Sequence, residues 1–169
     1  MKKYKDRSTF FSYGVGALVI YNNKALLIKK RSSGRWLIPS GFVQSGDSLL
    51  KTLKRELREE SGIIINGTHV KVEGIIAVRH RHNSKVGNNI WIVFLVKAKA
   101  TSLPLLSIKD TEEIEKVQFF NIDNLLKKDT KADEITKIIL RKYQKNKTLF
   151  SGRYQGLASQ GDAFYHLFL

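Results

Sequence analysis

The chain has 169 residues, of which 42% are apolar and 27% charged, and this composition indicates one globular domain with a hydrophobic core. It contains no cysteine, which excludes a disulfide framework, a thiolate zinc site and a cysteine nucleophile, and which is typical of a reducing, cytoplasmic location. The formal net charge of +15 favours anionic partners, although a lysine-rich background composition explains it equally well.

The first expected elements are two strands, residues 14–21 and 24–30, joined by a tight turn at Asn22 and Asn23. The N-terminus resembles a signal peptide, with basic residues followed by an apolar run, but that run continues into the second strand and predicts a hairpin. No apolar run is long enough to cross a bilayer, so we expect no membrane partner.

A loop punctuated by Gly34, Pro39 and Gly41 follows, and after it the sequence predicts a helix over residues 48–61. Ser45 or Asp47 is expected to cap the start of this helix, and Gly62 suits the position just past its end. A stripe of Leu50, Leu53 and Leu57 is expected to dock the helix on a sheet.

Further strands are expected at residues 69–80, 88–100 and 117–122, with a loop at 81–87 and a short helical turn at 121–128. Residues 132–144 repeat apolar side chains at the spacing of an amphipathic helix. The order of strands and helices predicts an α/β (α+β) layered domain on a mixed sheet. We place it at residues 1–150, followed by a tail at 151–169.

Three carboxylates of the first predicted helix, Glu56, Glu59 and Glu60, are spaced to share one face. A charged outer face stabilised by pairs such as Arg55 with Glu59 explains this pattern. Clustered acids also repel one another unless a cation lies among them, and a Gly/Pro loop lies just upstream. Oxygen ligands of this kind suit a hard cation such as Mg²⁺, and the absence of His and Cys argues against zinc.

The stretch from Gly41 to Ile63 resembles the signature of the Nudix hydrolase family, GX5EX7REUXEEXGU, in which U is a bulky aliphatic residue. Gly41 opens it, "REL" at 55–57 and "EE" at 59–60 fill its centre, and "GI" at 62–63 closes it. Upstream, "WLIPSG" is similar to the usual W-x-x-P-G-G entry of the family. The resemblance implies an α/β/α sandwich around a mixed β-sheet.

The chain departs from the usual pattern of the family at three positions, of which only Asp47 is a fixed position of the signature itself. Asp47 stands where a glutamate is expected, which keeps the charge but shortens its reach, so we expect tuning and not loss of activity. Ser40 replaces a glycine whose carbonyl commonly contacts the metal, and Gln44 replaces a frequent glutamate. A backbone carbonyl survives the change to serine if the local φ and ψ suit it.

The resemblance implies Mg²⁺-dependent hydrolysis of a diphosphate linkage in a nucleoside diphosphate derivative, with Mn²⁺ as an alternative ion. The implied metal ligands are the Ser40 carbonyl, Glu56, Glu59 and Glu60, with Arg55 supporting the site. Metal ions would neutralise the diphosphate and acidify a bound water. The carboxylate that takes the proton is Glu56, or an acid from the loop at 112–113, of which Glu113 is our candidate; an exposed acidic loop is the alternative.

Phosphate also needs positive partners, and we expect Arg31, Arg35, Arg79 and Arg81 to bind substrate, because arginine forms bidentate contacts with phosphate. Solvated loop and strand ends are the alternative for each of them. Trp36 is a candidate for stacking on a base, although packing against the sheet is more common.

Two other functions are compatible with the sequence. The basic charge favours an RNA 5′-end pyrophosphohydrolase or decapping enzyme, and a non-catalytic nucleotide-binding module of the same fold is the other alternative. The segment after the signature has neither the proline nor the tyrosine that is typical of family members specialised for ADP-ribose or dinucleoside polyphosphates. The apolar tail is expected to pack on the domain or at the interface of a homodimer.

Overall fold

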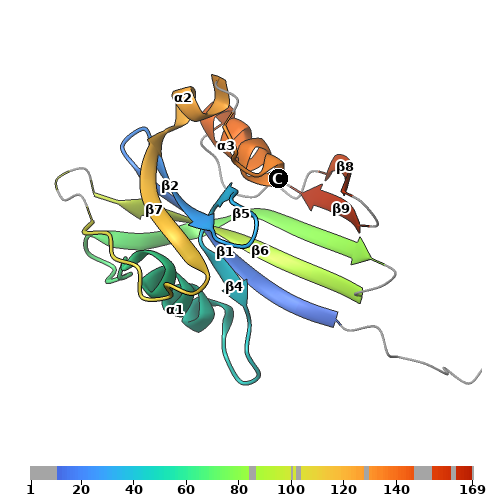
Figure 1. Ribbon diagram of the computed structural model, residues 1–169, viewed down its shortest axis with the longest axis horizontal. Helices are drawn as coiled ribbons and strands as arrows, with labels where there is room; N and C mark the ends of the chain where they lie inside the picture. The colour runs from blue at the N-terminus through green and yellow to red at the C-terminus, as the bar shows by residue number, and fades with distance from the viewer. Residues whose placement is uncertain are drawn as a thin grey trace, which may run out of the picture.

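The computed structural model describes residues 11–83, 87–99, 101, 104–127, 130–146, 154–160 and 163–168 (Figure 1). The strands are β1 (Phe11–Tyr21), β2 (Lys24–Lys30), β3 (Trp36–Leu37), β4 (Ser40–Phe42), β5 (Val70–Asn83), β6 (Gly87–Ala98), β7 (Ile114–Asn121), β8 (Tyr154–Gln160) and β9 (Ala163–Phe168). The helices are α1 (Leu49–Ser61), α2 (Ile122–Lys127) and α3 (Glu134–Asn146).

The strands form a mixed sheet, as predicted. Its order is β3-β2-β1-β6-β5-β9-β8, with β4 paired to β1 and β7 paired to β2. β1 and β6 are parallel, whereas the other pairs are antiparallel. The hairpin turn between β1 and β2 is where the sequence predicts it, and Asn22 there has a φ of 53°, the positive value that asparagine tolerates.

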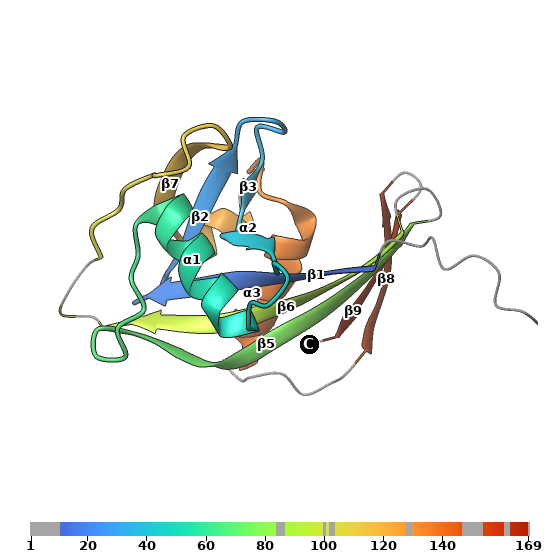
Figure 2. The same ribbon diagram turned by 90° about the horizontal axis from the view of Figure 1, so that it is seen from below.

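Helices cover both faces of the sheet (Figures 1 and 2). On one face, Leu53 and Leu57 of α1 are fully buried against valines of β1 and β6. On the other face, Ile139 and Leu140 of α3 and Leu125 of α2 are buried against leucines of β1, β2 and β6. Burying apolar side chains in both layers gives the predicted α/β/α sandwich.

Helix α1 has a capping residue at each end; the one at its end was predicted from the sequence, and the prediction for its start was wrong. Ser48 is the N-cap, because its side chain accepts a hydrogen bond from the Lys51 N–H at 3.1 Å; Ser45 and Asp47 are not. Gly62 ends the helix with a φ of 77°.

In the predicted leucine stripe of α1, Leu53 and Leu57 are buried as expected, but Leu50 is not. Leu50 is 47% exposed. Leu49 instead joins Leu53 and Leu57, since residues at i, i+4 and i+8 continue one face of a helix.

Between Arg31 and Asn83, the structure has two strands that were not predicted, β3 and β4, and a β5 that is longer than predicted. β3 and β4 form within the expected loop, because β4 pairs with Gly14–Gly16 of β1, where the hairpin with β2 no longer occupies that edge. β5 extends to Asn83, into the expected loop at 81–87, through its pairing with β6. The result places β4 directly beside α1.

The main chain of residues 154–160 and 163–168 extends the sheet beyond β5. β9 pairs with β5 from Val78 to Asn83, and β8 pairs with β9. The division at residue 150, and a homodimer built through the tail, stay predictions. No helix among the described residues is both long and apolar enough to cross a membrane.

Candidate active site

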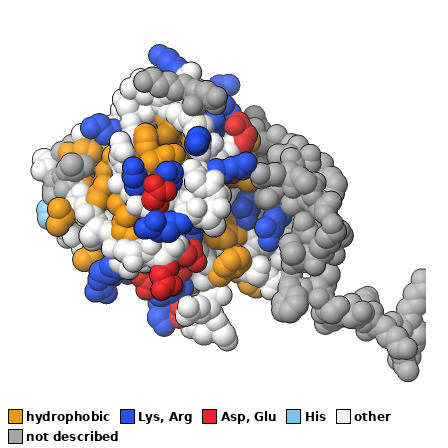
Figure 3. Space-filling view, viewed as in Figure 1, with side chains coloured by type: hydrophobic (Ala, Val, Ile, Leu, Met, Phe, Trp, Pro, Cys, Tyr) orange, Lys and Arg blue, Asp and Glu red, His pale blue; other side chains and the backbone are white. Residues whose placement is uncertain are grey.

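An acidic cleft of about 400 Å³ lies between α1, β4 and the loop that precedes β7. In a chain with twice as many basic as acidic residues, the described residues that line this cleft include four carboxylates and two basic side chains. Figure 3 shows acidic side chains gathered over α1, with basic side chains around them. The residues that line the acidic cleft are Lys30, Ser40, Gly41, Phe42, Gln44, Arg55, Glu56, Glu59, Trp91, Asp110 and Glu113.

The Glu56 carboxylate lies directly against the main chain of Gly41. A Cβ added at Gly41 would collide with the carboxylate, so no larger residue fits here without moving Glu56. Burial raises the pKa of Glu56 above its ordinary value, while the adjacent Arg55 guanidinium offsets part of this effect. The glycine therefore leaves room for a partly desolvated carboxylate to lie against β4.

The Glu60 carboxylate is the buried acid of the site. Its residue is only 2% exposed, and its Oε2 accepts a hydrogen bond from the Ser40 N–H at 2.7 Å. Its Oε1 lies 3.2 Å from Lys30 Nζ. Burial raises the pKa of Glu60 to about 7, because Lys30 and the Ser40 N–H offset only part of the lost hydration.

Lys30 joins the helix to the loop before β7. Its ammonium group pairs with Glu60 and also with Glu113. Burial lowers the pKa of Lys30, but its bonds and charge interactions with these two carboxylates outweigh that effect and raise it above its usual value. The β2–β7 pairing shifts register between Lys29 and Lys30, and such bulges often redirect a side chain beside a site.

Arg55 holds the carboxylates on the outer side of the cleft. Its Nη1 lies 2.5 Å from Glu56 Oε1 and 3.5 Å from Glu59 Oε2, and its Nη2 donates to the Phe42 carbonyl at 3.3 Å. Asp47 reaches Arg55 Nε only at 4.0 Å and instead pairs with Lys51 at 2.7 Å. Asp47, which is shorter than the expected glutamate, thus keeps a negative charge near Arg55, at the longest distance that counts as an ion pair.

Trp91 forms the apolar wall of the cleft. Its ring meets Phe42 edge-on at 5.4 Å between centroids, and the Arg79 guanidinium lies 5.0 Å from its centre. Gly14 leaves room for the indole, because a Cβ there would overlap it. A smaller recess of about 150 Å³ shares Trp91 and Ser40 with the cleft and reaches α3.

The predicted site residues divide into two groups. Ser40, Arg55, Glu56, Glu59 and Glu113 all line the cleft. Glu60 does not line it but accepts a hydrogen bond from the Ser40 N–H. The four predicted phosphate-binding arginines do not line it.

Each of these arginines has a different place in the structure. Arg31 donates to the Thr111 carbonyl at 2.8 Å, and Arg35 is exposed. Arg79 lines the smaller recess and bonds to buried Asn89, whereas Arg81 lies further along β5, opposite Asn89 of β6. Their roles in substrate binding stay predictions.

Sequence reasoning missed Lys30, Trp91 and Asp110. The sequence around Lys30 does not reveal its role, because its partners Glu60 and Glu113 are both more than twenty residues away in the chain. Trp36, the aromatic weighed for base stacking, packs edge-on against Phe120 at 4.7 Å in the core.

The donor set of the cleft fits a hard divalent cation. The predicted ligands supply only oxygen atoms, and Glu60 is a buried carboxylate that an ion would stabilise in its charged form. Among the described residues, no three His, Asp or Glu side chains are already grouped as a metal site. Lys30 and Arg55 contact oxygens of Glu60 and Glu56 for which a cation would compete.

The chain resembles known proteins in sequence. A family model described as NUDIX domain matches residues 11–142. An ADP-ribose pyrophosphatase from Methanocaldococcus jannaschii is 28% identical over 131 residues, which are 75% of this chain and 72% of that protein. Nudix hydrolase 2 of Arabidopsis thaliana is 30% identical over 63% of this chain, which spans little more than a third (37%) of that longer protein.

Solved structures share the fold. A MutT protein from Methanosarcina mazei superposes with a TM-score of 0.66 at 18% identity, covering 85% of this chain and 99% of that one. A C. elegans Ap4A hydrolase superposes with a TM-score of 0.64 at 16% identity, covering 79% and 96%. At these identities the likeness concerns the arrangement of the chain, and the substrates named for those proteins remain theirs.

Proposed function

The chain belongs to the NUDIX domain family, whose members hydrolyse phosphoric anhydride bonds, and we propose that it cleaves the diphosphate linkage of a nucleoside diphosphate derivative by attack of water at phosphorus. The observation that carries the proposal is the cleft itself. Glu56 and Glu60 lie partly or fully desolvated on one helix face, against Ser40 and Gly41 of β4. A buried carboxylate is costly unless it is paired and hydrogen-bonded, and carboxylates with a raised pKa that line a cleft are candidates for a functional site.

The residues suited to hold Mg²⁺ or Mn²⁺ are the Ser40 carbonyl, Glu56, Glu59 and Glu60. When bound, such an ion supplies charge neutralisation for the diphosphate and a more acidic water. The Ser40 N–H keeps Glu60 oriented through its 2.7 Å bond, and Arg55 keeps Glu56 in place. These contacts fix the carboxylates before substrate arrives, which lowers the cost of ordering the site.

Two carboxylates of the cleft are suited to accept the proton of the attacking water, Glu56 and Glu113. A base is more effective when its pKa is closer to the working pH, and burial raises the pKa of Glu56 in that direction. Glu113 has the more open side chain and is paired with Lys30. Comparing the pH profile of kcat for Glu56→Gln and Glu113→Gln assigns the base, because its loss removes the acidic limb of the profile.

The test is turnover on a substrate panel with Mg²⁺ or Mn²⁺: ADP-ribose, nucleotide sugars, NADH, diadenosine polyphosphates, nucleoside triphosphates and capped RNA. Reaction in ¹⁸O-labelled water should place the label in a phosphate product, as attack at phosphorus requires. We expect less than about a hundredfold preference in kcat/KM for ADP-ribose or diadenosine polyphosphates, because charged contacts alone supply no shaped slot for a second nucleoside. The absence of metal-dependent cleavage on the whole panel would contradict the proposal.

A second candidate function is hydrolysis at the 5′ end of RNA, which the formal charge of +15 favours. A 5′-triphosphorylated oligonucleotide should then be cleaved with a KM that rises steeply with salt. Equal salt dependence for the oligonucleotide and for a free nucleotide would argue against an RNA substrate.

A further inference from the structure

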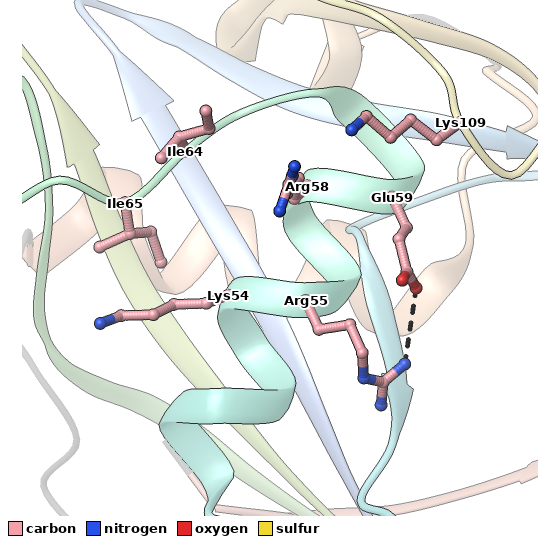
Figure 4. Close-up of a pocket in the computed structure, with 7 residues that line it drawn as sticks. All are labelled: Lys54, Arg55, Arg58, Glu59, Ile64, Ile65 and Lys109. Atoms are coloured by element: carbon pink, nitrogen blue, oxygen red, sulfur yellow. Dashed lines mark ion pairs between the residues drawn. The ribbon is translucent and has the colours of Figure 1, made fainter.

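A second cavity, of about 340 Å³, lies beside the outer face of α1 (Figure 4). Its described walls combine the basic side chains of Lys54, Arg55, Arg58 and Lys109 and the carboxylate of Glu59 with the apolar side chains of Ile64 and Ile65. Lys54 and Arg58 come from α1 and Lys109 from the loop before β7. We call this the α1 basic cavity.

The cations of this cavity are available to an external anion. Lys54 and Arg58 are four residues apart on one helix face, a spacing at which like charges repel. Within the described residues neither has an acidic partner, whereas the other cations of α1 do: Lys51 pairs with Asp47, and Arg55 pairs with the glutamates of the cleft. The repulsion between Lys54 and Arg58 would be relieved by a bound anion.

The main chain holds the two sides of the cavity together. The N–H groups of Lys109 and Asp110 both donate to the Glu59 carbonyl, at 2.8 and 3.1 Å, and the Ser107 N–H donates to the Ser61 carbonyl at 3.0 Å. Because these bonds tie the loop to the last turn of α1, Lys109 stays opposite Arg58 without any ligand. A preformed cluster binds with less loss of conformational entropy.

The α1 basic cavity adjoins the acidic cleft. Arg55 and Glu59 line both, and the ion pair between them, drawn in Figure 4, forms the boundary. Arg55 and Glu59 thus separate the cleft from Lys54 and Arg58, for which the described residues contain no acidic partner. Phosphate oxygens form charge-assisted bonds with such Lys and Arg groups.

We propose that the α1 basic cavity binds a phosphate group of the substrate that lies beyond the scissile diphosphate, so that substrates with a longer phosphate chain are bound more tightly. This assignment rests on the hydrolase function proposed above and names a substrate class for it: nucleoside triphosphates and longer polyphosphates over compounds that carry a diphosphate alone.

The first experiment compares KM for a nucleoside triphosphate and for ADP-ribose in the Lys54→Ala/Arg58→Ala double variant. We expect KM for the triphosphate to rise about tenfold or more, with kcat nearly unchanged and KM for ADP-ribose unaffected. The matched control is Arg141→Ala/Lys145→Ala, which removes the same two residue types at the same spacing from α3. An equal rise for both substrates, or no rise in the double variant, would overturn the proposal.

The second experiment needs no turnover. Calorimetric titration of metal-free protein with inorganic tripolyphosphate should give binding in the wild type and in Glu60→Gln, and about tenfold weaker binding or none in the Lys54→Ala/Arg58→Ala variant. Binding that is the same in the wild type and the double variant overturns the assignment of the cavity. Binding lost in the double variant, together with no hydrolysis of any nucleotide, would instead support the cavity and refute the proposed activity.

Discussion

Helices α1 and α3 have the same length of 13 residues, and each buries an apolar face on the sheet. They differ in the burial of their charged side chains. In α1, Glu60 is 2% exposed and is held by bonds that reach β2 and β4. In α3, the ion pair of Arg141 with Glu134, at 2.9 Å, joins two side chains that are more than half exposed. A helix needs no buried charge to pack, so the helix that keeps one is the candidate for chemistry.

The largest difference between the helices should come from Glu60→Gln. Activity should fall about a thousandfold at saturating Mg²⁺, because the change removes a ligand charge while preserving shape. The protein should stay folded by circular dichroism. Glu134→Gln in α3 is the control and should leave kcat unchanged. Near-wild-type turnover in Glu60→Gln would remove this residue from the site.

A smaller loss is expected from Gly41→Ala, which tests the other side of the cleft. The new methyl group would overlap the Glu56 carboxylate and displace it, and a displacement of about 1 Å can cost up to about a hundredfold in kcat. The control is Gly67→Ala, at a φ of 75° with no atom within 4 Å of the added Cβ. It should lower stability by about 1 kcal/mol without changing kcat. Wild-type kcat in Gly41→Ala would show that Glu56 needs no fixed position.

The stability of the metal-free protein should depend on pH through Glu60. Its pKa is about 7 in the folded state and 4.5 in its ordinary state, so its contribution is fully present below pH 4.5 and is lost as pH rises through 7. Thermal unfolding in chelator should therefore show a lower Tm at pH 7.5 than at pH 5, and Glu60→Gln should reduce this decrease. Parallel Tm curves for the wild type and the variant would contradict the burial effect.

The smallest effect is expected from Arg141→Ala on α3. An exposed ion pair contributes about 0 to 1 kcal/mol, so chemical denaturation should show a change within that range and kcat should not move. A loss of activity in this variant would mean that α3 takes part in the reaction, and the contrast between the two helices would fail.

Much of the site could be predicted from the chain because its spacing is local. Glu56, Glu59 and Glu60 share a face in any helix that spans them, and Gly62 ends that helix through its positive φ. The resemblance to the Nudix signature then pointed to the fold, which the mixed sheet and the matched domain model confirm.

The remaining features depend on contacts between residues that are distant in the chain. Lys30 reaches Glu60 and Glu113 from the end of β2, where the β2–β7 pairing shifts register. Trp91 meets Phe42 only because β4 and β6 flank the same glycines of β1. Helical periodicity follows from backbone geometry within one segment, whereas strand register and ion pairing are chosen by the packing of the whole domain.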